Sequence, residues 1–158
     1  MATNSGSAYW AASFWQAARY GLCFALLRNW AFDLTAITQA PYWTTPPWMD
    51  EYSQGASGVW NWLGNRISAL VTGVTSTDIA NGTNLNIGGK SVYFVRFANG
   101  YVYLNCIGNG QVTIPSGNIP GGACHYLTNG GYSDPSTPYG TQVTSFVLKD
   151  GDARIMLP

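Results

Sequence analysis

The residues from Ser91 to Cys106 read SVYFVRFANGYVYLNC, and they carry the clearest structural signal in this sequence. Two segments rich in β-branched and aromatic residues flank Asn99-Gly100. Such a dipeptide favours a two-residue type I′ turn, in which both central residues need positive φ. We therefore predict an antiparallel β-hairpin that turns at Asn99 and Gly100.

The two faces of this predicted hairpin differ in character, because side chains alternate along a strand. The apolar face pairs Phe97 with Val102, Val95 with Leu104, and Tyr93 with Cys106. The mixed face pairs Ala98 with Tyr101, Arg96 with Tyr103, and Phe94 with Asn105. The apolar face suits a core, whereas the mixed face suits contact with a sister subunit. Candidate subunit-interface residues are therefore Phe94, Arg96, Tyr101 and Tyr103.

The composition points to a protein that works in an assembly. The chain has 158 residues, which is one domain or two small modules. Charged residues are 9% of the chain, against about 25% in typical globular proteins. Few charges and a net charge of zero promote association. Seven cations offset by seven anions leave no basic surface, so we predict no nucleic-acid partner.

The N-terminal half begins with a proline-free, helix-permissive segment from Ser7 to Leu34. Apolar residues lie on nearly all sides of this predicted helix, so it must be buried in protein or in lipid. Arg19, near its centre, would cost roughly 2.5–3.5 kcal/mol in a membrane span. We therefore expect the helix to dock into a protein assembly, and a membrane-active helix over residues 8–34 is the alternative.

Two further N-terminal segments fit an assembly role. Prolines keep the segment QAPYWTTPPWMD, residues 39–50, out of a helix, so it is either a clamp onto a neighbour or a linker that folds back. Candidate virion-anchor residues are Trp10, Phe14, Trp15, Leu22, Trp30, Tyr42, Trp43 and Trp48. Residues 57–73 contain a short heptad seam, which predicts either a stalk between subunits or an ordinary helix packed on the first. The seam adds the candidate interface residues Trp60, Leu63, Ile67 and Leu70.

A polar, turn-rich segment over residues 75–89 marks a boundary between two parts. Residues 1–83 are then a helical and Pro/Trp-rich anchor or assembly region, and residues 84–158 are a small antiparallel β-sandwich. The predicted fold class is α+β. A β module of this size is marginal without disulfides, metals or partners, so we expect oligomerisation to support it.

Beyond the first hairpin, QVTI over residues 111–114 predicts a short strand that ends at Pro115. A second hairpin is predicted to turn at Asp150-Gly151. Its apolar face would pair Leu148 with Ala153 and Phe146 with Ile155.

We predict no enzyme activity, no cofactor and no metal. The only histidine, His125, follows Cys124, and neighbours in an extended segment point to opposite faces. Asp150 and Asp152 flank a glycine, which a turn explains. The sequence contains no phosphate loop and no cluster with metal-ligand spacing. An odd number of cysteines without zinc-like spacing favours reduced thiols over a Cys106–Cys124 bridge.

The loop from Gly121 to Gly140 is the strongest candidate for binding. It carries rigid aromatic rings and short polar side chains among glycines and prolines, which suits stacking and hydrogen bonding to a saccharide or a protein. Candidate receptor-binding residues are His125, Tyr126, Asn129, Tyr132, Asp134 and Tyr139. A plain connecting or subunit-contact loop is the alternative.

Four segments follow one another in the second half: SVYFVRFANGYVYLNC, QVTIPSGNIPGG, a tyrosine- and glycine-rich loop, and TSFVLKDGDARIML. Their order over residues 84–158 resembles the C-terminal head of tailed-bacteriophage fibre and minor tail proteins. The resemblance implies a homotrimeric virion protein assembled in the host cytoplasm. Its N-terminal half would contact other tail or baseplate proteins, and its distal loop would contact a host glycan or protein.

The sequence thus favours a virion structural protein, a short tail fibre or minor tail protein, that binds the host surface. Its minimal shaft and aromatic N-terminal helix depart from the usual fibre. The alternatives are a capsid decoration protein or head fibre, a lectin-like glycan-binding module, and a membrane-active protein.

Overall fold

The computed structural model describes residues 12–28, 63, 83–127 and 140–158. Within them, an α-helix lies against a six-stranded antiparallel sheet with the strand order β1-β2-β3-β8-β5-β6, and β4 and β7 form a separate two-stranded ribbon. The elements are α1 Ala12–Arg28, β1 Thr83–Asn84, β2 Val92–Phe97, β3 Gly100–Asn105, β4 Val112–Ile114, β5 Cys124–Tyr126, β6 Gln142–Val143, β7 Phe146–Leu148 and β8 Ala153–Leu157, with short 3₁₀ turns at Ser116–Asn118 and Pro120–Gly122. The predicted α+β class is confirmed, while the β-sandwich and the trimer stay predictions.

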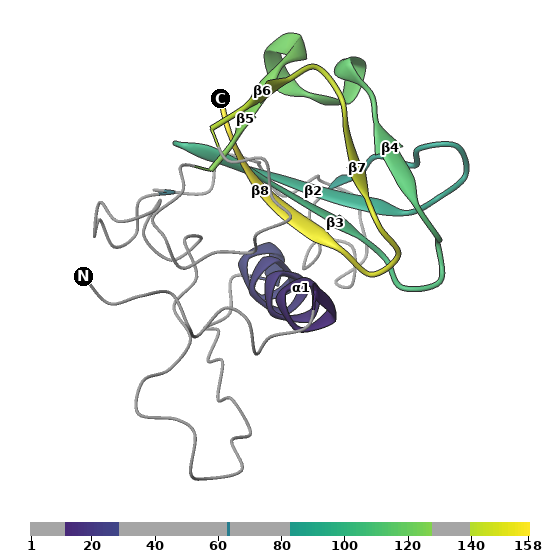
Figure 1. Ribbon diagram of the computed structural model, residues 1–158. Helices are drawn as coiled ribbons and strands as arrows, with labels where there is room; N and C mark the ends of the chain where they lie inside the picture. Colours follow the sequence, from purple (N-terminus) through teal and green to yellow (C-terminus); the bar gives the residue numbers. More distant parts are fainter. Residues whose placement is uncertain (1–11, 29–62, 64–82, 128–139) are drawn as a thin grey trace, which may run out of the picture.

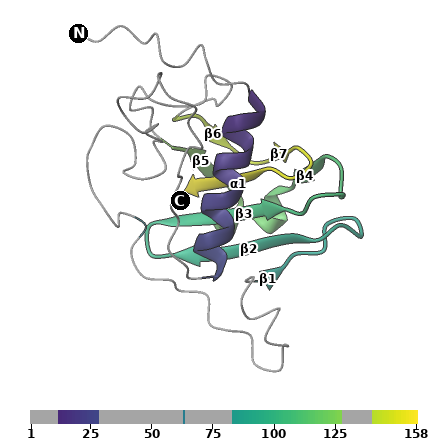
Figure 2. The same ribbon diagram turned by 90° about the horizontal axis from the view of Figure 1, so that it is seen from below.

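The large sheet is covered on both faces. Helix α1 packs across β2, β3 and β8 on one face, and the ribbon of β4 and β7 lies over the other (Figure 1, Figure 2). The helix-side core consists of Leu22, Cys23, Leu27, Leu63, Val95, Phe97, Val102, Leu104, Leu127, Ala153 and Ile155. The ribbon-side core consists of Val92, Tyr101, Tyr103, Val112, Ile114, Ile119, Cys124, Tyr126, Phe146, Leu148 and Met156.

The first hairpin forms between β2 and β3, but its turn lies one residue earlier than predicted. Phe97 pairs with Gly100, so the turn residues are Ala98 and Asn99. Neither Asn99 nor Gly100 has the positive φ of a type I′ turn. The Asn99 N–H instead donates to the carbonyl of Leu63 at 3.0 Å, a tertiary contact that local sequence does not reveal.

The error in register leaves the faces of the hairpin unchanged. Val95 lies opposite Val102 where the sequence predicted Leu104, a slip of two residues. Because the side-chain period of a strand is two, each side chain keeps its predicted face. The prediction of an apolar face and a mixed face is therefore confirmed.

The predicted second hairpin is wrong. Asp150-Gly151 does turn, with the Asp152 N–H donating to the Lys149 carbonyl at 3.2 Å, and Gly151 adopts a φ of 59°. However, β7 pairs with β4, while β8 pairs with β3 and β5. The turn therefore leads the chain from the ribbon to the large sheet. The expected partners separate accordingly, with Phe146 and Leu148 in the ribbon-side core and Ala153 and Ile155 in the helix-side core. In the sheet, β8 pairs with β3 over four residues, and this long-range pairing replaces the local hairpin.

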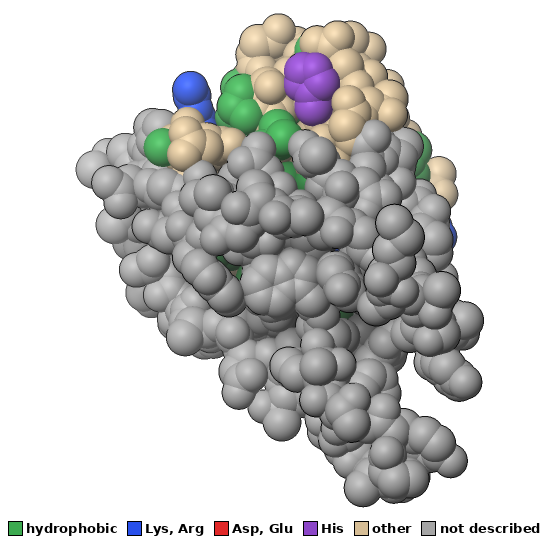
Figure 3. All heavy atoms as spheres, turned by 60° about the vertical axis from the view of Figure 1, so that its left-hand side comes forward, with side chains coloured by type: hydrophobic (Ala, Val, Ile, Leu, Met, Phe, Trp, Pro, Cys, Tyr) green, Lys and Arg blue, Asp and Glu red, His purple; other side chains and the backbone are tan. Residues whose placement is uncertain are grey.

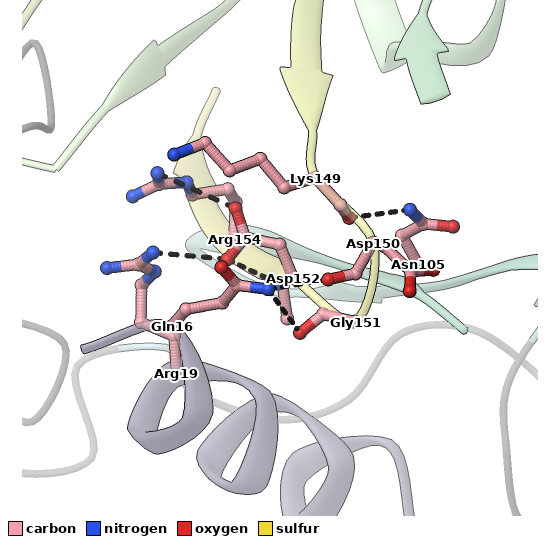
Figure 4. Close-up of polar contacts among 9 residues, drawn as sticks. Gln16, Arg19, Asn105, Lys149, Asp150, Gly151, Asp152 and Arg154 are labelled. Carbon is pink, nitrogen blue, oxygen red and sulfur yellow. Dashed lines mark hydrogen bonds and ion pairs between the residues drawn. The ribbon is translucent and has the colours of Figure 1, made fainter. Parts of the chain in front are cut away.

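Polar contacts fix α1 against the turn before β8 (Figure 4). The Arg19 guanidinium lies 3.1 Å from Asp152 Oδ1, and both side chains are almost completely buried, with Arg19 3% and Asp152 1% exposed. Arg154 lies 3.7 Å from the other Asp152 oxygen. Gln16 donates to the carbonyls of Asp150 and Gly151. These contacts explain how Arg19 is accommodated in a buried position on a largely apolar helix.

The helix and the sheet share one core, although the sequence assigned them to separate parts. Leu22, Cys23 and Leu27 of α1 pack with residues of β2, β3 and β8. Leu22, a candidate virion-anchor residue, is thus buried inside the chain. Among the described residues, no helix is long and apolar enough to cross a membrane.

We predict that Asp152→Asn lowers the free energy of unfolding by about 3–5 kcal/mol, because it leaves a buried guanidinium beside a neutral amide. Equilibrium denaturation in urea measures this change. Lys149→Ala, at an exposed neighbouring position, is the matched control and should change stability by less than about 0.5 kcal/mol. A loss below about 1 kcal/mol for Asp152→Asn would show that the pair does not hold α1 in place.

Candidate functional site

The predicted binding loop, residues 121–140, is not a loop throughout, because Cys124–Tyr126 form β5, which pairs with β6 at one edge of the large sheet. The Gly140 N–H donates to the Leu127 carbonyl at 2.9 Å, and the Tyr126 N–H donates to the Thr141 carbonyl at 3.0 Å. Both ends of the 128–139 segment are therefore held side by side, next to a leucine that belongs to the helix-side core. Asn129, Tyr132, Asp134 and Tyr139 lie in that segment, outside the described residues.

His125 and Gln142 form the described side-chain part of this site, which we call the β5–β6 edge. The two residues are direct cross-strand partners, so their side chains share one face of the sheet. Gln142 is exposed, and His125 is partly exposed. Figure 3 shows the histidine ring, in purple, at the molecular surface. His125 Nδ1 lies 3.0 Å from the carbonyl oxygen of Pro158.

Gln142 was not predicted from the sequence. It lies among polar residues in a segment, TQVTS, that resembles any exposed edge strand. Its position becomes informative only through its pairing with His125. The sequence offered one signal for this site, which was a histidine followed by a loop and then by a short polar strand.

Tyr126 does not belong to a binding surface, so this prediction is wrong. Its side chain is only 8% exposed, and its ring packs edge-on against Phe146 at a centroid distance of 6.5 Å. Burial raises the pKa of its phenol. Neighbouring residues in a strand alternate between faces, so Tyr126 points into the ribbon-side core while His125 points the other way.

The mixed face of the first hairpin is covered by the ribbon of the same chain, which corrects the predicted subunit interface. Tyr101 and Tyr103 are buried in the ribbon-side core, and Phe94 packs against it. The ring centroid of Tyr103 lies 4.9 Å from that of Phe94 and 5.1 Å from that of Phe146. Its hydroxyl donates to the Asn118 carbonyl at 3.0 Å. These rings are therefore not available to a sister subunit.

The remaining candidate residues lie on the surface, in the core or in the part of the chain that is not described. Arg96 is exposed on β2. Leu63 belongs to the helix-side core. Outside the described residues lie Trp60, Ile67, Leu70, Trp10, Trp30, Tyr42, Trp43 and Trp48, together with the side chains of Phe14 and Trp15.

Asp150 and Asp152 have structural roles, and the prediction of a turn is confirmed. One oxygen of Asp150 accepts the N–H groups of Gly108 and Gly110, at 2.9 and 2.8 Å. The buried amide of Asn105 donates to the carbonyls of Gly110 and Lys149 at the same corner. In the described part of the chain, no three His, Cys, Asp or Glu side chains group as metal ligands.

The three cysteines are free thiols, as predicted. Cys124 is buried in the ribbon-side core, and burial raises its pKa to about 11. Since the thiolate is the nucleophile, this thiol is unreactive near neutral pH. Cys124 and His125 also point to opposite faces of the sheet, so they do not form a dyad.

Family models, curated proteins and solved structures were all compared with this chain, and none matches it.

We predict that stability falls at alkaline pH partly through Tyr103. Burial raises the pKa of Tyr103 above its ordinary value of 10.0, with smaller contributions from Cys124 and Tyr101. The unfolded chain therefore loses this proton first. The stabilisation is complete below pH 10.0 and is lost as the pH rises above that value. Urea denaturation of the wild type and of Tyr103→Phe, at neutral and alkaline pH, measures it.

Tyr103→Phe should also lower stability at neutral pH by about 0.5–1.5 kcal/mol, because the hydrogen bond to Asn118 is lost. Its stability should then fall less steeply with pH than that of the wild type. Equal slopes for the two proteins would contradict the burial of this phenol.

Proposed function

We propose that this protein is a structural protein of a virion, a short tail fibre or minor tail protein, that binds the host surface through the β5–β6 edge. The observation that carries this proposal is the closure of the 128–139 segment by hydrogen bonds at Leu127 and Gly140. Recognition loops commonly have ends fixed on a rigid scaffold. Here the scaffold is β5, which is paired with β8 inside the large sheet.

The residues at this edge suit a glycan or protein ligand. The 128–139 segment supplies Tyr132 and Tyr139 for stacking, and Asn129 and Asp134 for hydrogen bonds. His125 and Gln142 add two polar side chains at its base. Rigid aromatic rings combined with short polar groups are typical of recognition surfaces.

Assembly into a homotrimer is part of the proposal, and low charge supports it. Only 9% of the residues are charged and the net charge is zero. Because the chain itself covers the mixed hairpin face, the contacts between subunits must lie elsewhere. We propose that the N-terminal tryptophans and tyrosines contact other virion proteins. A membrane-active role would instead require α1 to leave the sheet.

The native mass of the full chain, measured by light scattering on a sizing column, tests the assembly. We expect three times the chain mass of 17.0 kDa. A monomer would contradict the trimeric fibre and favour the lectin-like alternative.

Binding by the loop is tested with a Tyr132→Ala, Tyr139→Ala double variant of the full chain. We expect roughly tenfold or greater loss of binding to a glycan array and to bacterial envelope preparations, because rigid aromatics dominate recognition surfaces. Val147→Ala is the matched control, since this residue is 43% exposed on β7, which pairs with β4 in the ribbon and not with β5 or β6. Loss of the native oligomer in the double variant would identify the tyrosines as subunit contacts instead.

A further inference from the structure

We propose that Ile107 forms the apolar centre of a contact between copies of this chain. The contact surface, which we call the Ile107 corner, is where the β3–β4 loop, residues 106–110, lies against the β7–β8 turn, residues 149–151. This inference rests on the homotrimer of the proposed function and locates one contact between its subunits.

Ile107 is the most exposed large apolar side chain in the described part of the chain, with 75% of its surface accessible to solvent. Val147, at 43%, is the only other described residue of this kind. Single apolar side chains are common on protein surfaces, so exposure alone does not identify an interface. The rigidity and the charges of the corner are the observations that do.

The corner holds the Ile107 side chain in a fixed place. This side chain lies close over the backbone of Gly151, where an added Cβ would be 2.9 Å from Ile107 Cγ1. The loop that carries Ile107 is tied to the turn, because Asp150 Oδ1 accepts the N–H groups of Gly108 and Gly110. A side chain that is already fixed loses little conformational entropy when a partner buries it, so more of its apolar burial contributes to binding.

The charges of the corner favour a second copy of this chain as the partner. Lys149 and Asp150 are exposed neighbours of opposite sign in the turn (Figure 4). A surface that carries both signs can face its own counterpart, because Lys149 of one copy can lie opposite Asp150 of the next. A surface with a single sign would repel its copies. Exposed ion pairs contribute little affinity, so the pair sets the orientation while Ile107 provides the apolar centre.

A contact at this corner leaves the proposed binding site open. Strand β8 begins at Ala153, directly after the turn, and its last residue, Leu157, pairs with His125 of β5. At about 3.3 Å per residue, the two ends of β8 lie roughly 13 Å apart. Copies that meet at the Ile107 corner can therefore still present their β5–β6 edges to a host surface.

Ile107→Asp in the full chain tests the contact, with native mass measured by light scattering on a sizing column. We expect the mass to fall from three times 17.0 kDa to a single chain, because a charge at the centre of the contact would be buried without a partner. Val147→Asp is the matched control, since it places the same charge at the other exposed large apolar residue. This control should keep the mass of the wild type.

Two milder variants keep the test decisive if Ile107→Asp does not fold. Ile107→Ala should raise the concentration at which the oligomer dissociates roughly tenfold or more, as loss of a central contact does. Ile107→Leu, which keeps an apolar side chain of the same size, should dissociate at the wild-type concentration. A wild-type trimer that Ile107→Asp or Ile107→Ala leaves unchanged would overturn this inference and leave the proposed function standing. A monomeric wild type would overturn both.

Discussion

Burial of strand β3 on both faces is the constraint on which the rest of this structure depends. All six of its residues are buried. Val102 and Leu104 point to the helix side, and Tyr101 and Tyr103 point to the ribbon side. A strand of this kind is stable only when two layers cover it, because each exposed face would leave large apolar side chains in water. The N-terminal helix supplies one layer, and the chain between β3 and β8 supplies the other.

The Arg19–Asp152 pair adds orientation to this apolar packing. Apolar residues lie on nearly all sides of α1, so apolar packing alone would permit several rotations against the sheet, whereas a buried guanidinium must face its carboxylate. A buried ion pair contributes little net stability, yet separating its members is costly. We therefore regard the pair as a device that selects one register of α1, while Leu22, Cys23 and Leu27 provide the apolar burial.

Local features of the fold could be predicted from the sequence, whereas pairing between distant segments could not. The two faces of the first hairpin follow from strand periodicity, and they survive a slip in register for the same reason. The turn itself lies one residue earlier than predicted, and there the Asn99 N–H donates to the Leu63 carbonyl. The prediction of the second hairpin was wrong because β8 pairs with β3, which is distant from it in the sequence. For the same reason, the sequence did not reveal that the ribbon covers the mixed face. The burial of Tyr103 and Tyr126 could therefore not be predicted. Gln142 became visible as a site residue only once β5 and β6 were paired.

The shared core positions the β5–β6 edge, since β5 pairs with β8 and β8 pairs with β3. The central claim is therefore that helix and sheet form one cooperative unit that supports the site. Amide hydrogen exchange of the full chain, followed by mass spectrometry, tests this claim most directly. We predict that α1 and β3 exchange through the same global unfolding event and show equal protection. Rapid exchange of α1 while β3 stays protected would contradict it, because the helix would then be a separate and detachable part.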